Sequence, residues 1–217
     1  GSQLVGTVIV SVVRNELDIL EAFVRYHVEL FDRLVIADHR SIDGSDELLR
    51  ELRSEGLPLD VRPLTAPIFR QGLTTTLLAR AVAEELRPEL IVPLDADEFV
   101  TAEEPDRVPS LIAELSRRRP TLVVQRNFVP MPDDDLGERN PVARIVHREP
   151  RDRRTISGKT RKVVVPGPLA ADPAWGIANG NHRVVPRAGQ GRIISDRDSE
   201  LFVAHYPVWS SPVCVDT

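Results

Sequence analysis

Cysteine and long apolar runs are both scarce in this sequence of 217 residues. Cys214 is the single cysteine, so the chain cannot form an internal disulfide or a zinc site built from several thiolates. No run approaches the ~18 to 20 apolar residues that a membrane helix needs. The first apolar segment, residues 4–13, lacks the basic leader of a signal peptide. We therefore expect a cytoplasmic protein with no transmembrane segment, free or peripheral to the inner membrane face.

An excess of positive charge is also missing. The chain has 28 Lys and Arg against 33 Asp and Glu, which gives a net charge of −5. This balance argues against nucleic acid as a partner. Two short basic runs, residues 117–120 and 148–154, are typical of solvated surface. The remaining composition, 41% hydrophobic and 28% charged, is ordinary for a globular domain.

The first hundred residues alternate between strand and helix patterns. Apolar, β-branched runs predict strands at residues 5–13, 33–38, 59–65 and 90–99. Helical periodicity predicts helices from Glu16, after residue 44 and over residues 73–87. The second of these helices has Ser45 or Asp43 as its expected N-cap and Gly56 as its stop.

This alternation predicts an α/β fold with a mainly parallel sheet and helices on both faces. After residue 100 the pattern is less regular and predicts a small antiparallel part. No internal repeat and no long linker separates two units, so we expect a single domain over residues 3–217.

Acidic residues follow the predicted strands. Asp38 ends the second strand, and Asp95, Asp97 and Glu98 lie at the end of the run "LIVPLDADEFV". The carboxyl ends of parallel strands meet at one edge of the sheet, where ligands bind. Clustered carboxylates there would repel one another unless a cation lies among them, and Mg²⁺ or Mn²⁺ prefers oxygen ligands. Helix-capping or solvated acids are the alternative interpretation.

Six short elements occur in a fixed order along residues 5–208. They are Asn15-Glu16, Tyr26-His27, the loop from Asp38 to Ser45, the run from Asp95 to Phe99, Gly180-Asn181-His182 and His205-Tyr206. In this order the chain resembles the glycosyltransferase family 2-like proteins of the GT-A fold, in the branch related to the family 92 glycosyltransferases.

The resemblance implies a metal-dependent glycosyltransferase of the hexosyltransferase type. Such an enzyme transfers a sugar, with inversion, from a nucleotide-diphosphate sugar to an acceptor hydroxyl on a glycan, a lipid-linked molecule or a small molecule. Residues 3–100 would form the nucleotide-binding half and residues 101–217 the acceptor-side half. Mn²⁺ or Mg²⁺ would be the cofactor, held by Asp97 and His205. The implied nucleotide-sugar residues are Asn15, Glu16, Asp38, Gln71, Gly72, Asp95 and Lys162.

The chain departs from the family pattern in two places. Many relatives carry a Glu-Asp pair that supplies the catalytic base, and residues 140–200 contain no clear equivalent. His182, Asp172 and Glu200 are the candidates that remain; histidine is a common general base in enzymes, and His182 could equally bind acceptor or phosphate. The chain also ends soon after His205, where relatives continue into further helices, so we expect it to be truncated at its C-terminus.

Several of these residues have a scaffold interpretation as well. Glu16 could be a first-turn acid that interacts with a helix dipole, and Asp38 could bond its own backbone in a turn. His205 could be a strand-end histidine bonded to a carbonyl. His27 lies on an apolar helical face, which favours a buried core histidine.

Two other function classes remain open from the sequence. A nucleotidyltransferase or another Mg²⁺-dependent phosphoryl-transfer enzyme also places acids at strand ends. Such enzymes usually carry a glycine-rich loop after the first strand, and residues 11–18 contain no glycine. A non-catalytic sugar-binding relative is the other alternative, against which the intact Asp-Ala-Asp argues.

Overall fold

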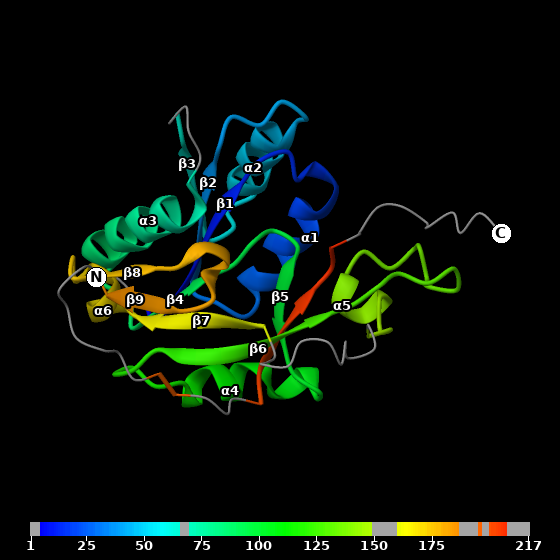
Figure 1. The fold of residues 1–217 in the computed structure, drawn as a ribbon. Coiled ribbons are helices and arrows are strands. Elements are labelled where there is room, and N and C mark those ends of the chain that lie inside the picture. The colour runs from blue at the N-terminus through cyan, green and yellow to red at the C-terminus, as the bar shows by residue number, and fades with distance from the viewer. Residues whose placement is uncertain (1–4, 66–69, 149–159, 187–194, 197–199, 208–217) are drawn as a thin grey trace.

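The computed structural model describes residues 5–65, 70–148, 160–186, 195–196 and 200–207 (Figure 1). Cys214 and most of the second basic run lie outside these ranges. The strands are β1 Thr7–Val13, β2 Arg33–Asp38, β3 Leu59–Pro63, β4 Leu90–Pro93, β5 Glu98–Thr101, β6 Thr121–Asn127, β7 Arg161–Pro166, β8 Trp175–Ile177, β9 Val184–Pro186 and β10 Phe202–His205. The helices are α1 Leu17–Val28, α2 Ser45–Ser54, α3 Gln71–Leu86, α4 Val108–Glu114, α5 Pro141–Arg144 and α6 Gly167–Ala171, with short 3₁₀ turns at Pro105–Arg107 and Asn179–Asn181.

Eight strands form one sheet in the order β3-β2-β1-β4-β7-β6-β10-β5. Strands β1, β2, β3 and β4 are parallel to one another, with Val13 opposite Asp38 and Val10 opposite Pro93. Their carboxyl ends therefore lie at one edge, which confirms the predicted α/β fold. Strands β8 and β9 form a separate antiparallel hairpin.

Two apolar cores cover the two faces of the sheet. Ile9 and Ile36 pack with buried residues of α1 and α2 on one face. Val8 and Val10, which point the other way, pack with residues of α3 and the β8–β9 hairpin (Figure 1). Alternate residues of an extended strand face opposite sides, so a central strand needs apolar residues throughout. The run "TVIVSVV" meets that need.

Three expectations were wrong in detail. The run over residues 90–99 is two strands: β4 ends at Pro93, and β5 lies at the far edge of the sheet. The second half is not purely antiparallel, because β10 pairs in parallel with β6. The N-cap of α2 is Gly44, at φ 102°, and no side chain caps the helix at that position.

The reason for the third difference is local. Asp43 accepts hydrogen bonds from the backbone and hydroxyl of Ser45, which tightens the turn and leaves Gly44 in the left-handed region that glycine tolerates. Gly56 follows the end of α2 at φ 85°, as the sequence predicts.

None of the helices in the described part of the chain combines the length and the apolar character that a membrane span requires.

Candidate functional site

A hollow of about 290 Å³ lies at the carboxyl ends of β1, β2 and β4. It collects residues that the sequence separates widely. The walls are formed by Val12, Val13, Arg14, Glu16, His39, Gln71, Asp95, Ala96, Asp97 and His205. A larger hollow of about 660 Å³ lies along the outer face of α1 and shares none of these residues. We place the candidate site in the smaller hollow, because it holds Asp95 and Asp97, the acids that follow β4, together with His205.

The loop after β2 fixes the chain after β1. Three successive backbone amides, those of Asn15, Glu16 and Leu17, donate to side-chain oxygens of Ser41, Ser45 and Asp43 at 2.9, 3.0 and 3.1 Å. These are amides at the start of α1, which no residue of the helix can satisfy. The loop motif therefore caps α1 from outside.

Asn15 also accepts a hydrogen bond from the same loop after β2. Its side-chain oxygen accepts from the backbone of Ile42 at 2.9 Å, and its φ of 56° turns the chain away from β1. This arrangement gives Asn15 a scaffold function in binding the two loops together. It leaves the side chain of Glu16 to face the hollow.

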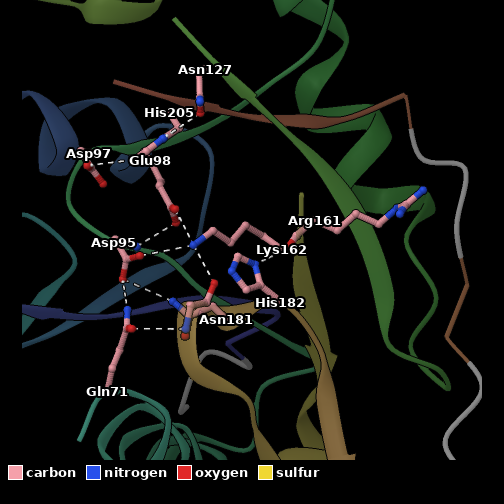
Figure 2. Close-up of polar contacts among 11 residues, drawn as sticks. Gln71, Asp95, Asp97, Glu98, Asn127, Arg161, Lys162, Asn181, His182 and His205 are labelled. Carbon is pink, nitrogen blue, oxygen red and sulfur yellow. Dashed lines mark hydrogen bonds and ion pairs between the residues drawn. The ribbon is translucent and has the colours of Figure 1, made fainter. Parts of the chain in front are cut away.

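Asp95 is held by three side chains that converge from different elements (Figure 2). Its Oδ1 accepts from Gln71 at 3.0 Å and from Asn181 at 3.4 Å, and its Oδ2 lies 3.3 Å from the Lys162 ammonium. The two carboxylate oxygens are thus both engaged. Asp95 links α3, β7 and the turn before β9.

Glu98 and Lys162 form a buried ion pair with 2.5 Å between Oε1 and Nζ. Their side chains are 1% and 5% exposed. Burial, followed by repulsion from Asp95, raises the pKa of Glu98 to about 7 although Lys162 works in the opposite direction. Burial alone would lower the pKa of Lys162, but Glu98 and Asp95 outweigh it, so that pKa lies above its usual value.

Asp97, Glu98 and His205 each offer a ligand atom within 4.8 Å of the others. His205 lies opposite Glu98 in the antiparallel pairing of β10 with β5 and opposite Asn127 in the parallel pairing of β10 with β6. Its Nε2 is 3.1 Å from Asp97 Oδ2, and its Nδ1 donates to Asn127 Oδ1 at 2.9 Å. The sheet register itself therefore assembles this group.

Glu98 is the least available of the three as a ligand. One of its oxygens faces Lys162 and the other accepts from the backbone of Asp95 at 3.0 Å. Asp97 and His205, which are 31% and 22% exposed, remain open to the hollow. The predicted pair for a metal is thus the accessible pair.

The charge state of His205 depends on Asp97. Burial works to lower the pKa of His205, but the hydrogen bond and the charge of Asp97 outweigh it and raise that pKa above its usual value. A ring that binds a metal through Nε2 must first lose the proton there. We expect the affinity for Mn²⁺ to be several-fold lower at about pH 6 than at about pH 8, and calorimetric titration at both pH values measures this. An affinity that does not change with pH would exclude His205 as a ligand.

Glu16 and Asp38, two further acids near the strand ends, differ in their surroundings. Burial, then repulsion from Asp97, raises the pKa of Glu16 to about 7. Asp38 is 9% exposed; one oxygen accepts from Ser41 at 3.1 Å, and the other has no hydrogen-bond partner among the described residues. A buried carboxylate oxygen of this kind suits a ligand that donates a hydrogen bond.

Gln71 and Gly72 hold the turn after β8. Gly72 donates its backbone hydrogen to Asn179 Oδ1 at 2.9 Å, and a Cβ at Gly72 would lie 2.6 Å from that oxygen. Gln71 accepts from the backbone of Gly180 at 3.2 Å. Glycine is thus required because α3 and the turn approach closely.

His182 lies at the end of this turn and is exposed. Its Nδ1 donates to the backbone oxygen of Arg161 at 2.7 Å, and its ring lies against Gly180 (Figure 2). The backbone oxygen of Gly180 in turn accepts from Lys162 at 2.7 Å. The turn that carries His182 is therefore attached to the acidic cluster through Lys162.

Asp172 is not brought together with these residues. It ends α6, where its Oδ1 accepts from the backbone of Ala174 and its carbonyl from Arg80. A helix of five residues places it near the start of β4, since Gly167 donates to the backbone of Glu89. The contacts are those of a turn residue before a proline.

The sequence predicted Glu98 only as one of several clustered acids, and it predicted no role for Asn127 or Asn181; the structure places all three in the cluster. Asn127 ends β6 as Asp38 ends β2, so the same signal, a polar residue at a strand end, could have identified it. Asn181 has a φ of 58° and is 1% exposed, and nothing in its local sequence indicates either property.

No model of a known protein family matches the chain, and no curated protein does. Among solved structures, the chain is similar to GalNAc-T7 with UDP, GalNAc and Mn²⁺, at a TM-score of 0.51 and 15% identity over 95% of this chain and 44% of that one. It also matches the mannosyltransferase PcManGT from Pyrobaculum calidifontis, with GDP-Man and Mn²⁺, at a TM-score of 0.45 and 17% identity over 58% of this chain and 37% of that one. A third match is residues 1–349 of TarS from S. aureus, at a TM-score of 0.42 and 16% identity over 56% and 36%.

The chain thus spans less than half the length of each of these structures. Identities this low bear on the fold alone, and of these three matches the one to GalNAc-T7 extends over nearly the whole chain. The mainly parallel sheet, the helices on both faces and this likeness agree with one another. The chain has the GT-A fold.

Proposed function

We propose that this protein is a metal-dependent glycosyltransferase that uses a nucleotide-diphosphate sugar. The observation that carries the proposal is the grouping of Asp97 and His205 beside Asp95 at the carboxyl ends of the parallel strands of a GT-A fold. Carboxylate and imidazole ligands with open positions are the type of site at which Mg²⁺ or Mn²⁺ binds a diphosphate. Transfer with inversion, and membership of the branch related to family 92, remain predictions from the sequence resemblance.

The donor set fits a divalent cation. Asp97 offers an anionic oxygen, and His205 offers Nε2 on a ring that Asn127 orients through Nδ1. The metal, when bound, neutralises charge on the leaving diphosphate. Two protein ligands leave several positions for phosphate oxygens and water.

The nucleoside would lie over β1 and β2. Asp38, at the end of β2, supplies a buried acceptor oxygen for the base or the ribose, although His39 and not Asp38 lines the hollow that Glu16 faces. Asp95 can contact the ribose or sugar once one of its present donors, Gln71 or Asn181, gives way. Lys162 is the cation of the cluster, and its charge lies next to Asp95.

His182 is the candidate base. A base must accept a proton from the acceptor hydroxyl as its oxygen attacks the anomeric carbon and the bond to the diphosphate breaks. Because Nδ1 donates to the carbonyl of Arg161, Nε2 is the nitrogen that can accept that proton. The acceptor, whether a glycan, a lipid-linked molecule or a small molecule, would then lie on the side of the turn after β8.

Calorimetric titration of UDP and of GDP, with Mn²⁺ and with EDTA, tests the proposal. We expect binding of one nucleotide that depends on Mn²⁺; equal affinity in both buffers would contradict the metal's part. Incubation with nucleotide sugars then separates the enzyme classes. A glycosyltransferase releases nucleoside diphosphate from the nucleotide sugar when an acceptor or water takes the sugar. A nucleotidyltransferase instead consumes added pyrophosphate and releases nucleoside triphosphate and sugar 1-phosphate, and a sugar-binding relative releases none of these.

His182→Ala should lower kcat by ~10² to 10⁴, which is the usual contribution of general base catalysis. Nucleotide-sugar affinity should change little, because Nδ1 bonds only to the backbone of Arg161 among the contacts described. Donor affinity, rate and melting temperature of this one variant identify its function. A loss of donor affinity in proportion to rate would indicate diphosphate binding, and a loss of stability with normal turnover of the folded fraction would indicate a scaffold function.

A further inference from the structure

Strand β5 is one of the two outer strands of the eight-stranded sheet and begins directly after Asp97. It pairs with β10 on one side, with Val100 opposite Val203. An outer strand presents unpaired backbone groups on its free side, and these must find partners when they are buried. Val100 is 4% exposed.

Two adjacent side chains of α1 supply those partners. The Tyr26 hydroxyl donates to the backbone oxygen of Val100 at 2.9 Å, and the backbone N–H of Val100 donates to His27 Nε2 at 3.3 Å. The N–H and C=O of one residue point to the same side of an extended strand. Tyr26 and His27 therefore form hydrogen bonds with the free side of β5 in the way that a neighbouring strand would.

The ring of His27 is fixed for this contact. Its Nδ1 donates to the backbone oxygen of Phe23 at 2.9 Å, so Nε2 carries the lone pair. The residue is 0% exposed. Burial lowers the pKa of His27 to about 3, although the hydrogen bond to Phe23 works in the opposite direction. The ring is therefore neutral, as a hydrogen-bond acceptor must be.

Aromatic contacts hold the same strand from its buried face. The Phe99 ring stacks on His27 with 5.4 Å between centroids and meets Tyr26 edge-on at 5.4 Å. It also meets Tyr206 edge-on at 5.5 Å. Tyr206 donates its backbone hydrogen to the oxygen of Asp97 at 2.9 Å. One cluster thus connects α1, β5 and the residue after His205.

We propose that Tyr26 and His27 are positioning residues for the metal site. Their hydrogen bonds to Val100 fix the position of β5, and β5 in turn fixes the carboxylates of Asp97 and Glu98 opposite His205. Val100 is three residues from Asp97, about 10 Å along an extended chain. A shift of β5 against β10 moves Glu98 away from Lys162 and Asp97 away from His205. The positioning of β5 by α1 follows from the contacts described above. The effect of β5 on metal binding rests on the proposed function.

The test compares three variants with a matched control. Tyr26→Phe removes one hydroxyl, and His27→Leu removes the acceptor but keeps an apolar side chain. His27→Gln restores an acceptor at the place of Nε2. Val82→Ala is the control, because Val82 is 0% exposed and lies on α3, whose buried residues belong to the other core. All are measured well below their melting temperatures.

The first measurement is amide hydrogen exchange without metal. We expect faster exchange over Glu98–Thr101 in Tyr26→Phe and His27→Leu, with β1 unchanged, and near wild-type exchange in His27→Gln. Exchange in β5 that matches the wild type, or that rises no more than in Val82→Ala, would overturn the proposal. Should His27→Leu not fold, Tyr26→Phe alone still decides the matter.

The second measurement is Mn²⁺ affinity by calorimetry. We expect a loss of about 10-fold in Tyr26→Phe and His27→Leu, the lower end of what residues behind metal ligands contribute, with recovery in His27→Gln and no loss in Val82→Ala. Wild-type affinity in both variants would overturn the link to the metal. If the wild type binds no Mn²⁺, the proposed function fails, and the exchange measurement alone decides whether the pair positions β5.

Discussion

Asp97→Ala should abolish metal-dependent binding of the nucleotide and lower kcat/KM by about 10³-fold or more. A metal contributes several kcal/mol of charge stabilisation to such a reaction, and each 1.36 kcal/mol corresponds to a factor of ten in rate. Asp97 is far more exposed than Glu98, the other carboxylate within reach of His205, and its side chain contacts His205. Its loss removes the anionic ligand and leaves the imidazole alone.

The fold should survive this change. Asp97 is held in place through its backbone oxygen, which accepts from Tyr206 and is kept in the variant. Loss of its charge also removes repulsion that raises the pKa of Glu16, so the metal-free variant should melt no lower than the wild type. A fall of more than about 4 °C, which corresponds to roughly 1 kcal/mol in a chain of this length, would favour a scaffold function.

Asp133→Ala is the matched control for that experiment. Asp133, Asp134 and His147 form a second group whose ligand atoms lie within 4.8 Å of one another, but Asp133 and His147 are exposed and the group lies between β6 and β7, on the two sides of α5. Removal of an exposed acid there should leave activity and melting temperature unchanged. An equal loss of activity in both variants would show that the acid at position 97 has no special function.

Local sequence signals predicted those parts of the site that depend on the parallel strands. The apolar run of β2 ends at Asp38 in the sequence and in the structure, because a buried strand must stop where a charged side chain reaches the edge. The ends of β1, β2 and β4 then meet by the rule for parallel sheets. His27 was likewise expected in the core, and it is buried there.

The other parts of the site depend on pairing between strands far apart in the chain, and the local sequence does not indicate that pairing. Strand β5 pairs with β10, about a hundred residues further along, and that register places His205 against Asp97 and Glu98. Lys162 lies in the run "RKVVVP", where a lysine looks like a surface residue. Only the antiparallel pairing of β7 with β4 and β6 turns it inward to Glu98.

The loop from Asp38 to Ser45 illustrates a different limit. The loop is one of the elements that carry the family resemblance, and its residues Ser41, Asp43 and Ser45 accept in the structure from the amides at the start of α1. The polar residues of one motif thus divide between the scaffold and the site. Sequence spacing cannot separate the two, because both need short oxygen-bearing side chains near backbone amides.

Lys162→Met should lower the free energy of unfolding by about 3 to 5 kcal/mol, the usual cost of removing one partner from a buried ion pair. Glu98 is left 1% exposed, facing Asp95 and without its cation. Methionine fills a similar volume and extends along the same path, so the cost is mainly that of the uncompensated carboxylate. Urea denaturation followed by circular dichroism measures it.

The pH dependence of this variant follows from Glu98. Burial already raises the pKa of Glu98 to about 7 against 4.5 for the unfolded chain, and Lys162 is the group that lowers it. Without Lys162 the folded pKa rises further. A raised carboxyl pKa gives stability that is present below the unfolded pKa and is lost as pH rises through the folded pKa. The variant should therefore lie closer to the wild type at about pH 5 than at about pH 8.

The double variant Glu98→Gln/Lys162→Met separates the charge from the packing. Glutamine keeps an oxygen that can accept from the backbone of Asp95, as Glu98 does now at 3.0 Å, but it carries no charge to leave uncompensated. We expect the double variant to recover most of the stability that Lys162→Met loses and to lack the pH dependence that Glu98 contributes between about pH 5 and 8. Recovery follows because replacing both members of a buried pair avoids the penalty of leaving one charge alone. A double variant no more stable than Lys162→Met would contradict this, because it would mean that Lys162 and Glu98 stabilise the fold independently of each other.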